Sequence, residues 1–212
     1  MNPSKRTLLG LGLAALGLLG MAALPISPAA AAARVGEPAP DFTGIDSNGV
    51  THRLGALAGS VVILEWTNHG CPYVGKHYRT GNMQRIQRDA IGRGVVWLTI
   101  VSSAPGTQGH VTAGQANALT ENRDAAPSAV LLDPDGVIGR LYGATVTPHM
   151  FVIDPAGAIA YMGAIDDKPS ARAGDVDTAH NYVLAALDAV IAGGEVETPY
   201  ARPYGCSVKY AY

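Results

Sequence analysis

Two cysteines are the residues of this sequence with the most distinctive chemistry. Cys71 and Cys206 are the only cysteines in the chain. Cys71 follows an apolar run, Val61–Trp66, and a polar turn, and a helical pattern begins directly after it with Pro72. The free N–H groups and positive dipole end of a helix start favour a thiolate, the nucleophilic form of sulfur. We therefore predict that Cys71 is a reactive thiol on an exposed turn; the alternative is a buried, inert cysteine.

Three histidines and a lysine lie close to this turn or beside Pro148. His69 either stabilises a thiolate or is a solvated loop residue, and we favour the loop residue. Lys76 and His77 follow about one turn into the helix, where we expect them at the surface. His149 is a candidate for the rim of the site. No Cys/His spacing matches a zinc site, so the sequence predicts neither a metal nor a cofactor.

The N-terminal segment has the pattern of a secretory signal peptide. Lys5 and Arg6 precede an apolar run from Leu8 to Leu24, and an alanine tract ends at Ala33. The alternative is a membrane anchor, but glycines interrupt the run and no charged stop-transfer segment follows. We predict that residues 1–33 are cleaved off, near Ala33. The mature protein would be periplasmic or secreted, with no stable membrane insertion. In an oxidising compartment, two thiols that can meet are usually paired.

Composition excludes some classes of partner. The formal net charge is −2, with 15 basic and 17 acidic residues. There is no basic stripe, and the sequence therefore predicts no nucleic-acid partner. About 179 residues remain after the signal peptide, enough for one domain with a sizeable core.

Hydrophobic periodicity predicts an α/β domain with a mixed sheet. The first two strands are joined through a helix and should be parallel. Two turn signals, at Asn48–Gly49 and at Asp154–Gly157, predict antiparallel hairpins, the first with a type I′ turn. The tail is irregular, and Gly205 gives Cys206 a flexible neighbour. Expected strands cover residues 61–66, 95–101, 129–132, 150–153 and 158–162, and expected helices cover 71–90, 112–123, 137–142 and 177–191.

The order of the motifs resembles the thioredoxin-like redoxin family, in its alkyl hydroperoxide reductase/thiol-specific antioxidant group. The resemblance covers residues 35–191, and the tail from 202 to 210 looks like that of exported members with a single active-site cysteine. The family implies a thioredoxin-like α/β fold: a central mixed β-sheet flanked by helices, with an N-terminal β-hairpin and an irregular C-terminal tail. The domain would span residues 34–194 and the tail 195–212. The matching motifs are Glu65–Val74, Val95–Val101, Leu132–Gly136, Thr147–Pro148 and Phe151–Asp154.

The resemblance also implies supporting residues around the cysteine. Thr147–Pro148 matches the loop in which family members hold a cis proline, and the backbone of the residue before it can pair with an extended substrate strand. The alternative is a trans proline that opens a strand. Glu65 has the offset from Cys71 at which thioredoxins place a buried acid that assists proton transfer. The alternative is a glutamate bonded to a neighbour at the strand end.

Departures from the family patterns narrow the chemistry. Val74 stands where thioredoxins carry a second cysteine, so a local dithiol mechanism is excluded. Asn68 and Leu64 stand where the peroxide-activating signature has Thr and Pro, and Thr67 is one residue away from the required place. The motif therefore does not support peroxidase activity.

Cys206 fits the missing role of a resolving thiol. The resemblance favours an oxidoreductase: an extracytoplasmic thiol-disulfide oxidoreductase in which Cys71 attacks and Cys206 then closes a disulfide across 135 positions. Its partners would be a protein or small-molecule disulfide or thiol, or a peroxide, and an external reductant. The alternatives are a thiol-dependent peroxidase with the same cysteines and a non-catalytic binding module. In that module, a permanent disulfide would leave the groove near Pro148 and the Tyr-rich tail as the binding surface.

Overall fold

The computed structural model describes residue 1 and residues 32–211. The predicted signal peptide over residues 1–33 therefore lies almost entirely outside the described residues. The described chain forms a mixed α/β structure around an eight-stranded sheet. In spatial order the strands are β2 (Thr51–Arg53), β1 (Thr43–Asp46), β5 (Ala129–Leu132), β4 (Val96–Val101), β3 (Val62–Trp66), β7 (His149–Ile153), β8 (Ile159–Gly163) and β9 (Tyr200–Ala201).

Two strand pairings at the centre of the sheet were predicted. β3 and β4 are parallel, and β7 and β8 form the antiparallel hairpin. β5 is also parallel to β4, and β7 is antiparallel to β3. β3 and β7 are buried along their whole length, which explains their nearly continuous apolar sequences. This confirms the thioredoxin-like mixed sheet flanked by helices.

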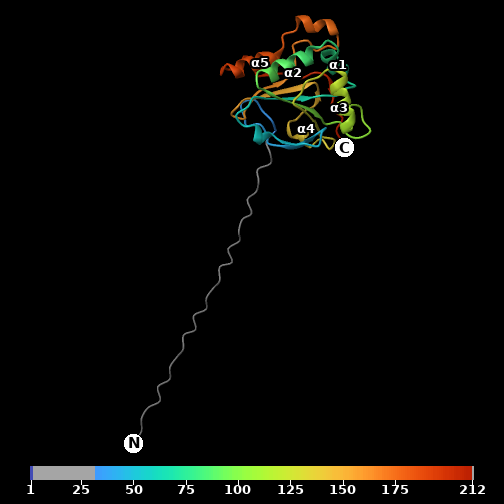
Figure 1. The fold of residues 1–212 in the computed structure, drawn as a ribbon. Helices are drawn as coiled ribbons and strands as arrows, with labels where there is room; N and C mark the ends of the chain where they lie inside the picture. Colours follow the sequence, from blue (N-terminus) through green and yellow to red (C-terminus); the bar gives the residue numbers. More distant parts are fainter. Residues whose placement is uncertain (2–31, 212) are drawn as a thin grey trace.

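Helices cover both faces of the sheet (Figure 1). On one face lie α1 (Pro72–Arg79), α2 (Asn82–Gly92), α3 (Ala113–Asn122) and α5 (Tyr182–Ile191), and on the other lies α4 (Val137–Leu141). Short 3-10 helices, η1 (Leu54–Leu57) and η2 (Ala173–Thr178), join other elements. On the face of the sheet that α4 covers, the rings of Trp66, Tyr142 and Phe151 pack together, with centroids 5.2–5.4 Å apart.

Three local predictions differ from the structure. The single helix over 71–90 is wrong, because Gly81 adopts φ +73° and separates α1 from α2. α5 begins five residues later than predicted, where the Asn181 side chain accepts a hydrogen bond from the Leu184 N–H at 2.9 Å. The hairpin at residues 43–53 is confirmed, but Asn48 lacks the positive φ of a type I′ turn.

The C-terminal tail contains two short strands that the sequence did not indicate. β9 adds to the edge of the main sheet beside β8. β10 (Cys206–Ser207) pairs antiparallel with β6 (Val146–Thr147), the strand immediately before Pro148. The tail therefore crosses the loop that the sequence places next to the reactive cysteine.

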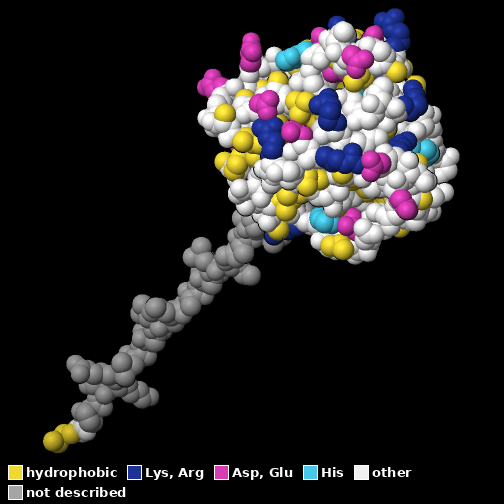
Figure 2. Space-filling view, turned by 45° about the horizontal axis from the view of Figure 1, so that its top comes forward, with side chains coloured by type: hydrophobic (Ala, Val, Ile, Leu, Met, Phe, Trp, Pro, Cys, Tyr) yellow, Lys and Arg dark blue, Asp and Glu magenta, His cyan; other side chains and the backbone are white. Residues whose placement is uncertain are grey.

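The surface is mixed in charge. Figure 2 shows Lys and Arg interspersed with Asp and Glu on the face in view, with apolar side chains between them. Within the described part of the chain, every helix is too short or too polar to cross a bilayer.

Candidate active site

Cys71 lies between β3 and α1, as the sequence predicts. Its backbone N–H donates to the Asn68 carbonyl at 3.0 Å, and it is the residue that caps α1, with the exposed Pro72 as the first helical residue. The predicted exposure of Cys71 is wrong, because only 1% of the residue is accessible. The apolar cluster around Cys71 includes Tyr204 and Cys206 from the tail. Elements distant in sequence therefore help to bury the turn.

The loop that contains Pro148 contacts Cys71 directly. The Thr147–Pro148 peptide bond is cis, as the resemblance implies. The Cys71 Sγ–H donates to the Thr147 carbonyl oxygen at 3.2 Å. Both loop residues are buried. The loop thus lies against the sulfur rather than at a distant strand start.

Cys206 reaches the same place through strand pairing. It lies opposite Thr147 in the β10–β6 pair. Gly205 has φ +143°, and a Cβ atom there would stand 1.9 Å from the Thr147 carbonyl oxygen. The sequence interpretation of Gly205 as a flexible neighbour is therefore incomplete, because only glycine allows this close approach.

The pKa values of the two thiols are shifted in opposite directions. Burial alone raises the pKa of Cys71, but hydrogen bonds from the Cys206 side chain and from the Val74 and Cys206 backbone N–H groups outweigh it and lower that pKa below its ordinary value. Burial and the contact with Cys71 raise the pKa of Cys206 to about 11. Both cysteines are free thiols in the structure. The thiolate therefore forms more readily on Cys71 than on Cys206.

Glu65 lies in a buried network of hydrogen-bond donors. Its carboxylate accepts from Tyr78 Oη at 2.8 Å, Trp97 Nε1 at 2.9 Å, Thr99 Oγ1 at 3.0 Å and Gln87 Nε2 at 3.2 Å. Burial raises the pKa of Glu65 above its ordinary value, against the opposing effect of these bonds. Cys71 is not among its described hydrogen-bond partners. The geometry matches the alternative of a glutamate bonded to its neighbours.

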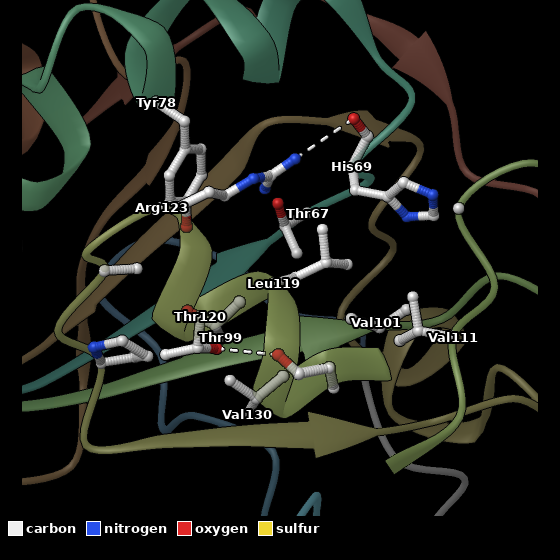
Figure 3. A pocket seen from close by; sticks show the side chains of 14 residues that line it. Thr67, His69, Tyr78, Thr99, Val101, Val111, Leu119, Thr120, Arg123 and Val130 are labelled. Carbon is white, nitrogen blue, oxygen red and sulfur yellow. Dashed lines mark hydrogen bonds between the residues drawn. The ribbon is translucent and has the colours of Figure 1, made fainter. Parts of the chain in front are cut away.

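Thr67 and His69 face a cavity of about 40 Å³ on the α3 side of the loop (Figure 3). Thr67 is buried, and its hydroxyl has no hydrogen-bond partner among the described residues. The Arg123 side chain lies over the Tyr78 ring and donates to the His69 carbonyl at 3.3 Å. His69 is exposed, and Cys71 is not part of the cavity wall. No hydrogen bond joins either side chain to Cys71 among the described residues.

Three further sequence interpretations are corrected. Lys76 and His77 are fully buried rather than at the surface, and His149 is 2% exposed rather than on a rim. Lys76 is buried because Asp166, from the loop after β8, lies 3.2 Å from its Nζ. His149 packs against Phe151 with ring centroids 4.7 Å apart.

The partners of Lys76 could not be predicted from the sequence. The Tyr204 hydroxyl accepts a hydrogen bond from Lys76 Nζ at 3.0 Å and donates to Asp166. In the sequence, only the position of Tyr204 two residues before Cys206 pointed to a place near the site. Nothing in the sequence placed Asp166 there. Across the described ranges, no group of three or more His, Cys, Asp or Glu side chains could hold a metal ion.

Comparison with solved structures identifies the fold. A hypothetical protein from Sinorhizobium meliloti 1021 has a TM-score of 0.72 at 22% identity, over 85% of this chain and 97% of that one. An uncharacterized conserved protein from Geobacillus kaustophilus has a TM-score of 0.71 at 23% identity, over 84% and 93%. A protein from Chlorobium tepidum with the provisional designation thiol:disulfide interchange protein DsbE has a TM-score of 0.53 at 24% identity, over 74% and 99%.

Sequence comparison supplies the family. A search of curated proteins found no significant match. The model of the AhpC/TSA family matches residues 35–162, which include β3, the turn with Cys71, the Thr147–Pro148 loop and all but the last residue of β8. This is more than half of the chain, so the protein belongs to the AhpC/TSA family of thioredoxin-like redoxins.

Proposed function

We propose that this protein is a thiol-disulfide oxidoreductase in which Cys71 is the nucleophile and Cys206 the resolving thiol. One observation carries the proposal: the only two cysteines of the chain meet at a helix start. The thiol with the lowered pKa is the one that caps the helix. The family and the fold support this chemistry.

The reaction follows from the difference between the two thiols. The Cys71 thiolate attacks one sulfur of a substrate disulfide, and the other substrate sulfur leaves as a thiolate that takes up a proton. Cys206 then loses its proton and attacks the Cys71 sulfur, which releases the second substrate thiolate. The substrate disulfide gains two electrons and two protons, and the protein dithiol becomes the Cys71–Cys206 disulfide. An external dithiol returns the protein to its reduced form.

The roles of the supporting residues follow their contacts. In the reduced protein the Thr147 carbonyl accepts a hydrogen bond from the Cys71 thiol, and the hydrogen-bond donors around Sγ stabilise the thiolate once the thiol has lost its proton. Pro148 and Pro72 shape the backbone on either side of the sulfur. Glu65 maintains the strand behind the site through its four donors. Export, with a periplasmic location, rests on the N-terminal sequence pattern.

The test is a pair of serine variants in a disulfide-exchange assay with oxidised glutathione and a disulfide-containing protein. Cys71→Ser should abolish exchange. Cys206→Ser should still attack, and it should accumulate a mixed disulfide between Cys71 and glutathione that mass spectrometry detects. If both variants exchange at the wild-type rate, the proposed mechanism is wrong.

Two further measurements on the wild-type protein distinguish the oxidoreductase from a binding module and from a peroxidase. A working disulfide should have a reduction potential above about −300 mV, whereas a permanent staple in a binding module should lie below it. Hydrogen peroxide should oxidise Cys71 slowly, since no hydroxyl of Thr67 supports the thiolate. Rapid oxidation by peroxide, measured in single turnover, would favour the peroxidase instead.

A further inference from the structure

The burial of Cys71 sets a condition on the proposed reaction. With 1% of Cys71 accessible, an external sulfur cannot approach its Sγ while the tail is docked. Yet the same tail carries Cys206, which must be close enough to complete the reaction. The contacts that hold the tail therefore affect both steps, in opposite directions.

The tail is attached on both sides of Cys206. Before it, β9 lies against β8, and the Ala164 N–H donates to the Ala201 carbonyl at 3.1 Å. After it, the Lys209 carbonyl accepts from the Ala104 N–H at 2.7 Å. We call the segment between these attachments, residues 202–208, the strap. Within the strap, β10 pairs with β6 and the Val208 N–H donates to the Thr145 carbonyl at 3.0 Å. Cys206 lies within the strap.

One side chain of the strap enters a buried charged cluster. Lys76 on α1 and Asp166 form an ion pair in which both side chains are at most 2% exposed. The Tyr204 hydroxyl joins this pair, accepting from Lys76 Nζ and donating to Asp166. The Tyr204 ring also packs edge-on against Tyr73, with centroids 5.8 Å apart.

The cluster connects the strap to the helix of the reactive sulfur. Lys76 lies five residues after Cys71 on α1, and Tyr204 lies two residues before Cys206. Hydrogen bonds to charged groups are stronger than those between neutral groups. Lys76 also donates to the Lys168 carbonyl at 3.0 Å, so its ammonium keeps partners within the body of the protein when Tyr204 leaves.

We propose that Lys76, Asp166 and Tyr204 form a latch that holds the strap closed over Cys71. Closing positions Cys206 for attack on Cys71, and opening admits the substrate disulfide. The latch deepens the proposed function and rests on it. Tyr204 is thus a positioning residue, because it acts through the placement of Cys206.

Tyr204→Phe is the central variant because it removes one hydroxyl and keeps the ring against Tyr73. Tyr200→Phe is the matched control, since Tyr200 lies on β9 and is 55% exposed. In a Cys206→Ser background, iodoacetamide should alkylate Cys71 about tenfold faster after Tyr204→Phe, as expected for loss of a hydrogen bond to a charged group. Tyr200→Phe should leave the rate unchanged.

With both cysteines present, the second readout should move the other way. The equilibrium between the Cys71–Cys206 disulfide and glutathione reports the effective concentration of Cys206 at Cys71. Tyr204→Phe should lower this effective concentration about tenfold. A variant that merely destabilised the domain would expose other buried groups as well, which urea unfolding would detect.

Gly205→Ala tests the strap without altering the latch. Its Cβ atom would clash with the Thr147 carbonyl oxygen, so Cys71 alkylation should again become faster. The latch proposal is overturned if Tyr204→Phe behaves like Tyr200→Phe, or if its two readouts change in the same direction. If wild-type protein forms no Cys71–Cys206 disulfide, the proposed function fails, while alkylation still tests the latch.

Discussion

Replacing Glu65 with leucine is expected to lower the free energy of unfolding by about 4 kcal/mol or more. The substitution removes the acceptor of four buried donors while leaving the donors in place. Each buried donor without a partner costs about 1–3 kcal/mol. The added apolar contact of leucine offsets only part of this loss. Urea unfolding followed by tryptophan fluorescence provides the measurement, since Trp97 belongs to the network.

Glu65→Gln separates a structural role from proton transfer. Glutamine keeps the shape and one acceptor oxygen, so its destabilisation should be smaller than that of leucine. The pH dependence of Cys71 alkylation should stay unchanged in Glu65→Gln, because Glu65 bonds to Tyr78, Gln87, Trp97 and Thr99. A shift of that profile by one pH unit or more would instead show that Glu65 takes part in the ionisation of Cys71.

Local patterns were sufficient for the frame of the site. The apolar run before Cys71 and the proline after it correctly predict a buried strand, a turn and a helix start, because each depends on neighbouring residues. The parallel pairing of β3 with β4 follows from the helical connection between them. The cis state of Pro148 came from the family resemblance rather than from spacing.

The burial of the site depended on contacts that no local pattern records. Cys71 looks exposed in its own segment, and the strap that helps cover it arrives from about 130 residues later in the chain. Lys76 looks like a surface lysine until Asp166 supplies a partner 90 residues away. Gly205 looks flexible, whereas its close approach to the Thr147 carbonyl oxygen requires the absence of a side chain.

Lowering the pH from about 6.5 to 4 is expected to destabilise the protein through two buried histidines. Burial lowers the pKa of His77 to about 4, with Asp166 and Lys76 acting in opposite directions. Burial lowers the pKa of His149 to about 4 as well. An unfolded histidine has a pKa of about 6.5, so between these values the unfolded chain binds protons that the folded chain excludes. Stability therefore rises with pH across this window, by about 3 kcal/mol for each histidine.

The window of pH distinguishes the histidines from the carboxylates. Hydrogen bonds from His52 and from backbone N–H groups outweigh burial and lower the pKa of Asp46, so its contribution is lost only below about pH 4. Burial raises the pKa of Glu65, so above the ordinary pKa of a glutamate the folded protein retains a proton that the unfolded chain has lost. In that range the contribution of Glu65 to stability falls as the pH rises. Wild-type protein alone therefore reports a sum, and a variant is needed to isolate one histidine.

His149→Phe isolates the contribution of His149 to the pH dependence of stability. No hydrogen bond is lost in this variant, because neither ring nitrogen of His149 has a hydrogen-bond partner in the described structure. Phenylalanine keeps the ring contact with Phe151 and cannot titrate. The free energy of unfolding at pH 7 should be equal to or above that of wild type, and its loss between pH 6.5 and 4 should shrink by about 3 kcal/mol. His180→Gln, at an exposed histidine, should leave the profile unchanged. An unaltered slope in His149→Phe would mean that His149 already gains its proton in the folded protein near pH 6.5, which burial of an unpartnered imidazolium opposes.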